Sequence, residues 1–372
     1  MPKQGGQSDW RSSNVTHDSG LKLLPKVDLH RHLEGSLRLQ TLVEMARTYD
    51  LDMPKELELL RPHVQVTNDP PNMNTFLAKF ETLRHFYRSP ETIHRLAYEV
   101  VADAARDNVR YLELRFSPQA LSRVRGFTLD EVTDWVIDAV KQASEEFGIH
   151  VALIITLVRH DPLEQAKQVA EMAFSRYGRG IHGLDLAGDE LNYSALPFKP
   201  LFLEANRLGL KTTLHAGEWC GADAVWLAVN EMKVDRIGHG VRAIDDPNLM
   251  ALLKERGTAL EVCLTSNMQT ASVDRLEKHP LKQFLQQNVP VTLNTDDPRI
   301  SNVTLTDEFE IAQRHLGVSY SEMRRMVFTA IDSGFVCDEE KVELRSFFAQ
   351  HWTPAPPDSA DNKPKWWGRR RA

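Results

Sequence analysis

The stretch PKVDLHRHLEGSLR, from Pro25 to Arg38, alternates like a β-strand and places two histidines one residue apart near its end. Because successive side chains of a strand point to opposite faces, His30 and His32 point the same way and can approach one ion together. A lone histidine on a strand is more often an ordinary core or surface residue. Whether this pair serves a site therefore depends on how the other strands of the chain end.

Seven further short apolar runs, rich in β-branched residues, recur along the chain, and stretches with helical periodicity separate them. With the first run, the expected strands are 26–33, 109–117, 150–158, 181–190, 210–218, 235–240, 258–267 and 289–298. Helices are expected between them at 128–147, 162–177, 201–208, 221–232 and 247–256. Parallel neighbours need a crossover connection, and eight strands close into a barrel whose interior the side chains just fill. The pattern therefore predicts an α/β protein with a (β/α)8 TIM barrel.

The alternative architecture is an open, doubly wound sheet. It requires a glycine-rich phosphate-binding turn after the first strand, and no G-x-G-x-x-G follows Leu33. The interval 37–108 is too long for one crossover helix, so we expect an inserted helical segment after the first strand, with one helix at 75–87. Residues 1–22 and 353–372 are polar and rich in glycine, proline or charge, which predicts disordered tails around one barrel domain at 23–352.

The composition excludes several classes of protein. With 42% apolar and 26% charged residues the chain is typical of a globular protein. Its formal charge of -7, without a long basic stripe, argues against nucleic-acid binding and favours a small-molecule partner. No signal peptide and no run of about 18 apolar residues occurs, so neither secretion nor a membrane is expected. Three widely spaced cysteines offer no disulfide framework, which favours the cytoplasm, and Cys220 is expected to be a small buried residue.

Six of the expected strands end in ionisable or hydrogen-bonding residues, namely HRH, DLAGDE, HAGE, GHG, TSN and NTDD. In a barrel all carboxyl ends of the strands lie at one mouth, where active sites of this architecture sit. Neutral imidazoles with a carboxylate suit Zn²⁺, and catalytic zinc keeps one position open for water, whose pKa falls from about 16 to about 7. We therefore predict one zinc ion held by His30, His32, His215 and Asp296, with solvent as the nucleophile.

Three further residues at these strand ends each have two possible roles. Glu218, three residues beyond His215, is a candidate proton carrier, but a glutamate there could also favour the positive end of a helix dipole. His239 lies between two glycines, where backbone can approach closely, and could bond the attacking water or be a turn histidine. Asp297 cannot share a strand face with Asp296, so only one of the two is expected to bind the metal. Asp297 could instead bind a substrate or cap the next turn.

Taken together and in this order, HRHLEG, GLDLAGDE, TTLHAGE, DRIGHG, LTSN and LNTDDP resemble the motifs of the adenosine deaminase family of metal-dependent amidohydrolases. The resemblance runs from about Leu24 to Lys341, and RPHVQV, YLELRFSP and LTSNMQT are similar to bacterial members in particular. It implies a (β/α)8 barrel with one zinc ion and the same four ligands. It also implies hydrolysis of adenosine and 2′-deoxyadenosine with release of ammonia, adenosine giving inosine, in purine salvage.

The same resemblance implies roles for individual residues. Glu218 matches the proton donor to purine N1, which makes C6 electrophilic, and His239 matches the histidine that positions and polarises the water. Asp297 matches the aspartate that faces N7, and Gly188 matches the glycine whose backbone N–H meets N3. His32 is implied as a substrate contact as well as a metal ligand.

Glu34 departs from the commoner family pattern H-x-H-L-D-G, in which an aspartate lies near the ribose 5′-hydroxyl. Relatives that accept adenine or other 6-aminopurines often carry a glutamate there. A site that hydrogen-bonds a substrate hydroxyl discriminates strongly, so adenine or another 6-aminopurine compound such as aminodeoxyfutalosine is the alternative substrate. A non-catalytic purine-binding barrel is the second alternative, and the complete set of expected site residues speaks against it.

Overall fold

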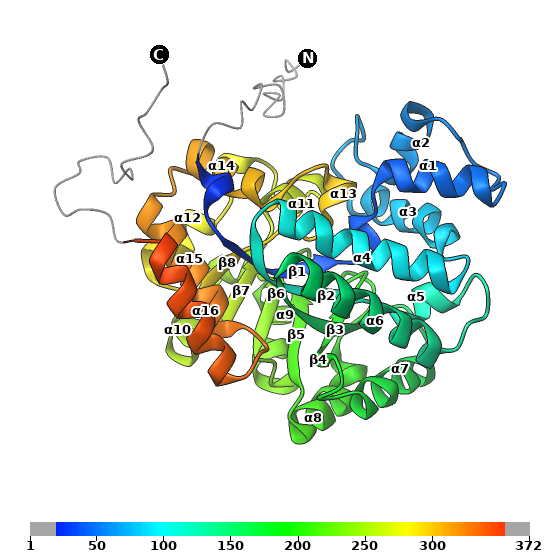
Figure 1. The fold of residues 1–372 in the computed structure, drawn as a ribbon. Helices are drawn as coiled ribbons and strands as arrows, with labels where there is room; N and C mark the ends of the chain where they lie inside the picture. Colours follow the sequence, from blue (N-terminus) through cyan, green and yellow to red (C-terminus); the bar gives the residue numbers. More distant parts are fainter. Residues whose placement is uncertain (1–19, 354–372) are drawn as a thin grey trace, which may run out of the picture.

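The computed structural model describes residues 20–353 and forms a barrel of eight parallel strands with helices on its outside (Figure 1). Each strand pairs in parallel with the next one along the chain. The strands are β1 Lys26–His32, β2 Val109–Phe116, β3 His150–Val158, β4 Ile181–Ala187, β5 Lys211–Ala216, β6 Arg236–His239, β7 Ala259–Val262 and β8 Val291–Leu293. The predicted (β/α)8 barrel is confirmed.

The barrel closes where its last strand, β8, and the residues after it lie beside its first strand, β1. The N–H of His32 donates to the carbonyl of Asp296 at 2.9 Å, and the N–H of Asp296 donates to the carbonyl of His30 at 2.8 Å. The side-chain oxygen of Asn294 accepts the N–H of Leu29 at 2.9 Å. This closure therefore fixes Asp296 beside two histidines that lie far from it in the sequence.

One or more helices follow each strand, and every helix predicted between the strands is present. They are α5 Pro118–Ser122, α6 Leu129–Phe147, α7 Leu163–Ser175, α8 Lys199–Leu208, α9 Ala222–Leu227, α10 Pro247–Arg256, α11 Leu264–Gln269, α12 Leu281–Gln287, α13 Pro298–Ser301, α14 Leu305–Leu316, α15 Tyr320–Ser333 and α16 Asp338–His351. The helix expected at 221–232 is α9 followed by a π-helix at Ala228–Met232. Local sequence sets such boundaries: a capping box between Thr128 and Glu131 begins α6.

The insertion after the first strand is helical, as predicted. It contains α1 Leu39–Thr48, α2 Leu57–Val64, α3 Met73–Leu83 and α4 Pro90–Arg106. The helix expected at 75–87 is α3 with a short 3-10 helix, Arg84–Phe86. In Figure 1 α1, α2 and α3 form a lobe beside the barrel. The N–H of Asn72, which caps α3, donates to the carbonyl of Gln269 at 3.0 Å and so joins this lobe to the barrel.

Two predicted strands are less than half as long as expected. The strand expected at 258–267 ends at Val262, and its last residues belong to α11. The reason is a distant partner: the carboxylate of Glu308 accepts the N–H groups of Leu264 at 3.0 Å and Thr265 at 3.1 Å, which caps the start of this helix. The strand expected at 289–298 is reduced to Val291–Leu293, so Asp296 and Asp297 lie beyond it.

The tails expected at 1–22 and 353–372 lie mostly outside the described residues, and the domain boundaries stay a prediction. Within the described part, Leu21–Leu23 form a short 3-10 helix in which Leu21 is buried. None of the helices among residues 20–353 combines the length and apolar character needed to cross a membrane.

Candidate functional site

The carboxyl ends of the strands surround a pocket of about 400 Å³, a volume typical of small-molecule sites. Phe76, Phe80 and Leu83 of the inserted helix α3 line one side of it. Among the predicted site residues, those that line the pocket are His32, Glu34, Gly188, His215, Glu218, His239, Asp296 and Asp297. His30 is fully buried and reaches the pocket through its contact with Asp296.

Three close contacts connect the four predicted metal ligands. Asp296 Oδ1 is 3.2 Å from His30 Nε2 and 3.4 Å from His32 Nε2, and His32 Nε2 is 3.3 Å from His215 Nε2. Four ligands bound tetrahedrally at about 2.0–2.1 Å lie about 3.3–3.4 Å from one another. These three separations match those expected between ligands of a single metal ion.

Carboxylates behind two of these histidines set their tautomers. His30 Nδ1 lies 2.7 Å from Glu261 Oε2, and His215 Nδ1 lies 3.1 Å from Asp185 Oδ1. A ring N–H on Nδ1 satisfies each carboxylate and leaves the lone pair of Nε2 facing the centre of the site, as in metal-binding histidines. His30 Nε2 has no hydrogen-bond partner among the described residues although it faces a carboxylate oxygen. A cation between these electron-rich atoms resolves their repulsion, so the residues fit a bound metal.

His239 also approaches the cluster. His30, His215, His239 and Asp296 each offer a ligand atom within 4.8 Å of the others, and His32 forms a second such group with His215 and Asp185. His239 Nε2 is 3.5 Å from Glu218 Oε2 and 3.9 Å from Asp296 Oδ2. Distance alone thus leaves both His32 and His239 close enough to be the third histidine ligand.

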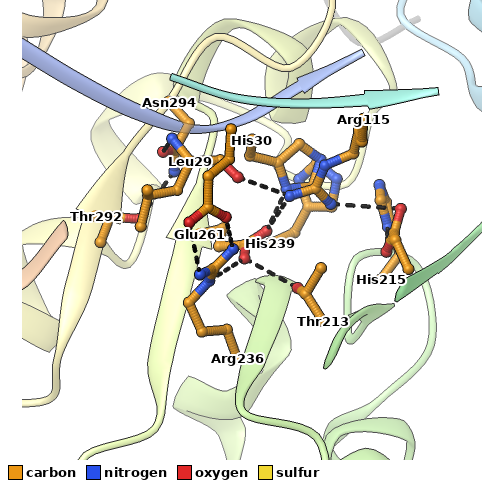
Figure 2. Close-up of polar contacts among 12 residues, drawn as sticks. Leu29, His30, Arg115, Thr213, His215, Arg236, His239, Glu261, Thr292 and Asn294 are labelled. Carbon is orange, nitrogen blue, oxygen red and sulfur yellow. Dashed lines mark hydrogen bonds and ion pairs between the residues drawn. The ribbon is translucent and has the colours of Figure 1, made fainter. Parts of the chain in front are cut away.

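Glu261 anchors a buried network of charges beneath the site (Figure 2). Besides facing His30, it accepts hydrogen bonds from Arg115 at 2.8 Å, Arg236 at 2.6 Å and Thr213 at 2.9 Å. Burial opposes ionisation of this carboxyl, but Arg115 and Arg236 hold its pKa well below the usual value. Glu261 is therefore an ionised acceptor that keeps His30 in the metal-binding tautomer.

Substituting Glu261→Gln tests this supporting role. We expect the dissociation constant for the bound metal to rise by about 10–100-fold, because the partner that orients His30 loses its charge. The free energy of unfolding falls by about 3–5 kcal/mol, since two buried arginines lose their anion. Chelator competition and denaturant titration of the metal-free protein measure the two effects. Glu204→Gln, at a partly exposed residue outside the pocket, is the matched control, and unchanged metal affinity in Glu261→Gln would contradict the assigned role.

Glu218 lies on the turn after β5, and Glu190 shapes that turn. The carboxylate of Glu190 accepts the four consecutive N–H groups of residues 217–220 at 2.7–3.1 Å. Glu190 was not predicted as a site residue, although it lies in the quoted motif GLDLAGDE. Cys220, expected to be buried, is half-buried, and its Sγ lies 3.3 Å from the carbonyl of Glu190 on the same turn.

Two carboxyl groups that face the pocket favour the protonated state. Burial, with repulsion from Asp296 and Glu190, raises the pKa of Glu218 well above its usual value. Burial, with repulsion from Asp296 and Glu34, does the same to the pKa of Asp297. Each group can therefore donate a proton or a hydrogen bond near neutral pH. Asp297 Oδ1 is buried and has no hydrogen-bond partner among the described residues.

Glu34 follows the two histidines of β1 and lies at another part of the pocket wall. Its Oε1 accepts the N–H of Ser117 at 2.8 Å, and burial raises its pKa to about 7. Arg84 and Tyr87 line the same pocket, and the buried Tyr87 hydroxyl has no hydrogen-bond partner within residues 20–353. The neighbouring Gly35 is required for space, because a Cβ there would overlap the carboxylate of Asp297.

Strained backbone occurs at two of the predicted site residues. His239 has φ +60° and Asp296 has φ +61°, in the left-handed region that residues with a side chain rarely adopt. Such conformations cost on the order of 1–3 kcal/mol each and cluster at functional sites. Here they turn an imidazole and a carboxylate toward the same pocket.

The chain is similar to known proteins in both sequence and fold. The family model described as Adenosine deaminase matches residues 25–351. The chain is 40% identical over 322 residues to the adenosine deaminase of Klebsiella pneumoniae (strain 342), covering 86% of this chain and 96% of that protein. A solved adenine deaminase from Arthrobacter aurescens is similar with TM-score 0.82 and 27% identity, over 88% of this chain and 98% of the other. A Burkholderia ambifaria amidohydrolase with bound Zn has TM-score 0.83 and 26% identity, over 91% and 93%.

Proposed function

The chain belongs to the adenosine deaminase family, and from that membership we propose that it hydrolyses adenosine and 2′-deoxyadenosine at C6 and releases ammonia, adenosine giving inosine. The observation that carries the proposal is the set of three imidazoles and one carboxylate, with His239 and Glu218 in contact with each other at the same pocket. The 40% identity to a curated adenosine deaminase supports the same substrate. Purine salvage in the cytoplasm is the setting that we propose for the activity.

We assign His30, His32, His215 and Asp296 as the residues that would hold one zinc ion. The spacing of their donor atoms, the tautomers of His30 and His215, and the Zn-bound amidohydrolase of similar fold support zinc. Zinc, when bound, lowers the pKa of water to about 7 and so supplies a nucleophile at neutral pH.

The protein side chains then act on the purine. Glu218, protonated because it is buried, donates its proton to N1, which makes C6 electrophilic. Asp297, also protonated, donates a hydrogen bond to N7, and the backbone N–H of Gly188 donates to N3. His239 lies 3.5 Å from the Glu218 carboxyl, where it can position the attacking water over C6.

The balance of the reaction is simple. The oxygen of water bonds to C6, and the bond from C6 to the amino group breaks. One hydrogen of water ends on N1 and the other on the departing amine. Adenosine plus water therefore gives inosine plus ammonia, without an oxidant or a second substrate.

A panel of 6-aminopurines tests the proposed substrate. Zinc-loaded protein is incubated with adenosine, adenine or aminodeoxyfutalosine, and the release of ammonia is followed. We expect adenosine to give the highest kcat/KM. Turnover of adenine alone would support the proposed deamination but identify adenine, and not adenosine, as the substrate. No turnover of any 6-aminopurine would support a non-catalytic purine-binding barrel.

The titration of Glu34 predicts how the affinity for adenosine depends on pH. With a pKa of about 7 its carboxyl ionises as the pH rises from about 6 to about 8. The ionised form is the stronger acceptor for the ribose 5′-hydroxyl, so KM for adenosine should fall about five- to tenfold over this range. Steady-state assays at several pH values measure it.

Two controls test whether the fall in KM comes from a contact between Glu34 and the ribose 5′-hydroxyl. Glu34→Gln cannot ionise, and 5′-deoxyadenosine lacks the hydroxyl, so neither should show the fall in KM. The same pH profile with 5′-deoxyadenosine as with adenosine would place Glu34 elsewhere than at the ribose.

A further inference from the structure

The two ring nitrogens of His239 face different surroundings. Nε2 faces the pocket, 3.5 Å from the carboxyl of Glu218 and 3.9 Å from that of Asp296. Nδ1 faces the buried side-chain amide of Asn267, 3.2 Å from its Nδ2. A neutral imidazole carries its proton on one nitrogen only, so the orientation of the Asn267 amide decides which nitrogen carries it.

A backbone amide fixes that orientation. The N–H of Leu281 donates to His279 Nδ1 at 3.1 Å, and a backbone N–H can only donate. His279 therefore carries its own proton on Nε2, which lies 3.2 Å from Asn267 Oδ1. The Asn267 oxygen must be the atom that faces His279, because an NH₂ group there would meet another donor.

The amide nitrogen of Asn267 then has two acceptors. One hydrogen points to Ser272 Oγ at 3.2 Å, and the hydroxyl of Ser272 is itself used as a donor to the Asn267 carbonyl at 3.0 Å. The other hydrogen points to His239 Nδ1. Asn267, His279 and His239 are each at least 98% buried, so water cannot replace these partners.

We propose that Asn267 and His279 are positioning residues that hold His239 as the neutral tautomer protonated at Nε2. This inference deepens the proposed function and rests on it for its chemical meaning. In this tautomer Nε2 has no lone pair for a metal, which leaves His32 as the third histidine ligand. His239 then donates a hydrogen bond to the oxygen of the attacking water and takes no proton from it. The proton goes to a carboxylate, and Glu218 is an acceptor once it has protonated N1.

Nitrogen NMR of the zinc-loaded protein reads the tautomer directly. In protein labelled with ¹⁵N-histidine, correlation through the ring protons distinguishes a protonated from an unprotonated ring nitrogen. A His239→Asn variant identifies the signals of this ring among the 14 histidines. We expect protonated Nε2 and unprotonated Nδ1, and a protonated Nδ1 would overturn the inference.

The isosteric Asn267→Asp variant reverses the partner of Nδ1 from a donor to an acceptor. We expect the ring proton to move to Nδ1 and kcat to fall by about 10²-fold or more, since a wrong tautomer costs up to about 10⁴-fold in serine proteases. KM and zinc content should stay within about threefold of wild type. Asn248→Asp makes the same change at an exposed position and should alter none of these quantities.

A pair of substitutions at His279 completes the test. His279→Gln retains a donor for Asn267 Oδ1 and should keep most of the activity, whereas His279→Phe removes the donor and should lower kcat. Equal kcat in both variants would contradict the proposal that His279 orients Asn267 and so sets the tautomer of His239. If the wild-type protein shows no deaminase activity but His239 is protonated at Nε2, the proposed function is refuted and the tautomer assignment is still supported. Failure of the proposed function can therefore be distinguished from failure of the tautomer assignment.

Discussion

Replacing Glu218 by glutamine should lower kcat for adenosine by about 10²–10⁴-fold and leave the zinc content unchanged. Glutamine keeps the size of the side chain and can still donate a hydrogen bond to N1, but it cannot transfer a proton. Glu218 does not belong to either group of potential metal ligands, so its substitution should not release the ion. Steady-state kinetics and metal analysis of the same preparation measure both quantities.

The exposed Glu231→Gln is the control for Glu218→Gln, because Glu231 pairs with Lys199 at the surface. Its kcat should equal that of the wild type. Turnover close to wild type in Glu218→Gln would remove Glu218 from the mechanism and leave the source of the N1 proton open.

Of the substitutions considered, removal of the His215 side chain is expected to lower turnover the most. In His215→Ala the ion loses a ligand and water loses its activation, so turnover should fall below about 10⁻⁴ of wild type as the pKa of water returns toward about 16. The zinc content should fall with it. A chelator should abolish the activity of the wild type, and added zinc should restore it in the wild type but not in the variant.

His150→Ala is the matched control, because His150 begins β3 at the end of the barrel away from the pocket and is exposed. Its zinc content and turnover should match those of the wild type. A His215→Ala variant that binds zinc as tightly as the wild type would show that His215 is not a ligand.

Much of the barrel could be predicted because its strands are buried on both faces and read as apolar runs between helices. The prediction was least accurate where a distant residue decides the local structure. TSN was placed at the end of a strand, whereas Glu308 caps the first turn of α11 there. Asn267 therefore projects from a helix, and the sequence alone did not indicate its contact with His239.

Some residues of the candidate site could likewise be predicted from the sequence, and others could not. The predicted ligands and proton donor lie at strand ends, where residue type and strand polarity together indicate chemistry. The sequence does not reveal the role of Glu261, a single acid within an apolar strand, or that of Asp185, the first residue of the quoted strand end DLAGDE. Only the assembled barrel shows that they face His30 and His215. Glu190 was missed because its role is to bind the backbone of residues 217–220.

The central claim is that this site adds solvent water to C6 of adenosine and expels ammonia. A single turnover in H₂¹⁸O, with zinc-loaded protein in excess over adenosine, tests it most directly by mass spectrometry of the product. The account predicts one equivalent of ammonia and inosine that carries ¹⁸O at C6. Unlabelled inosine, or adenosine recovered unchanged, would contradict it.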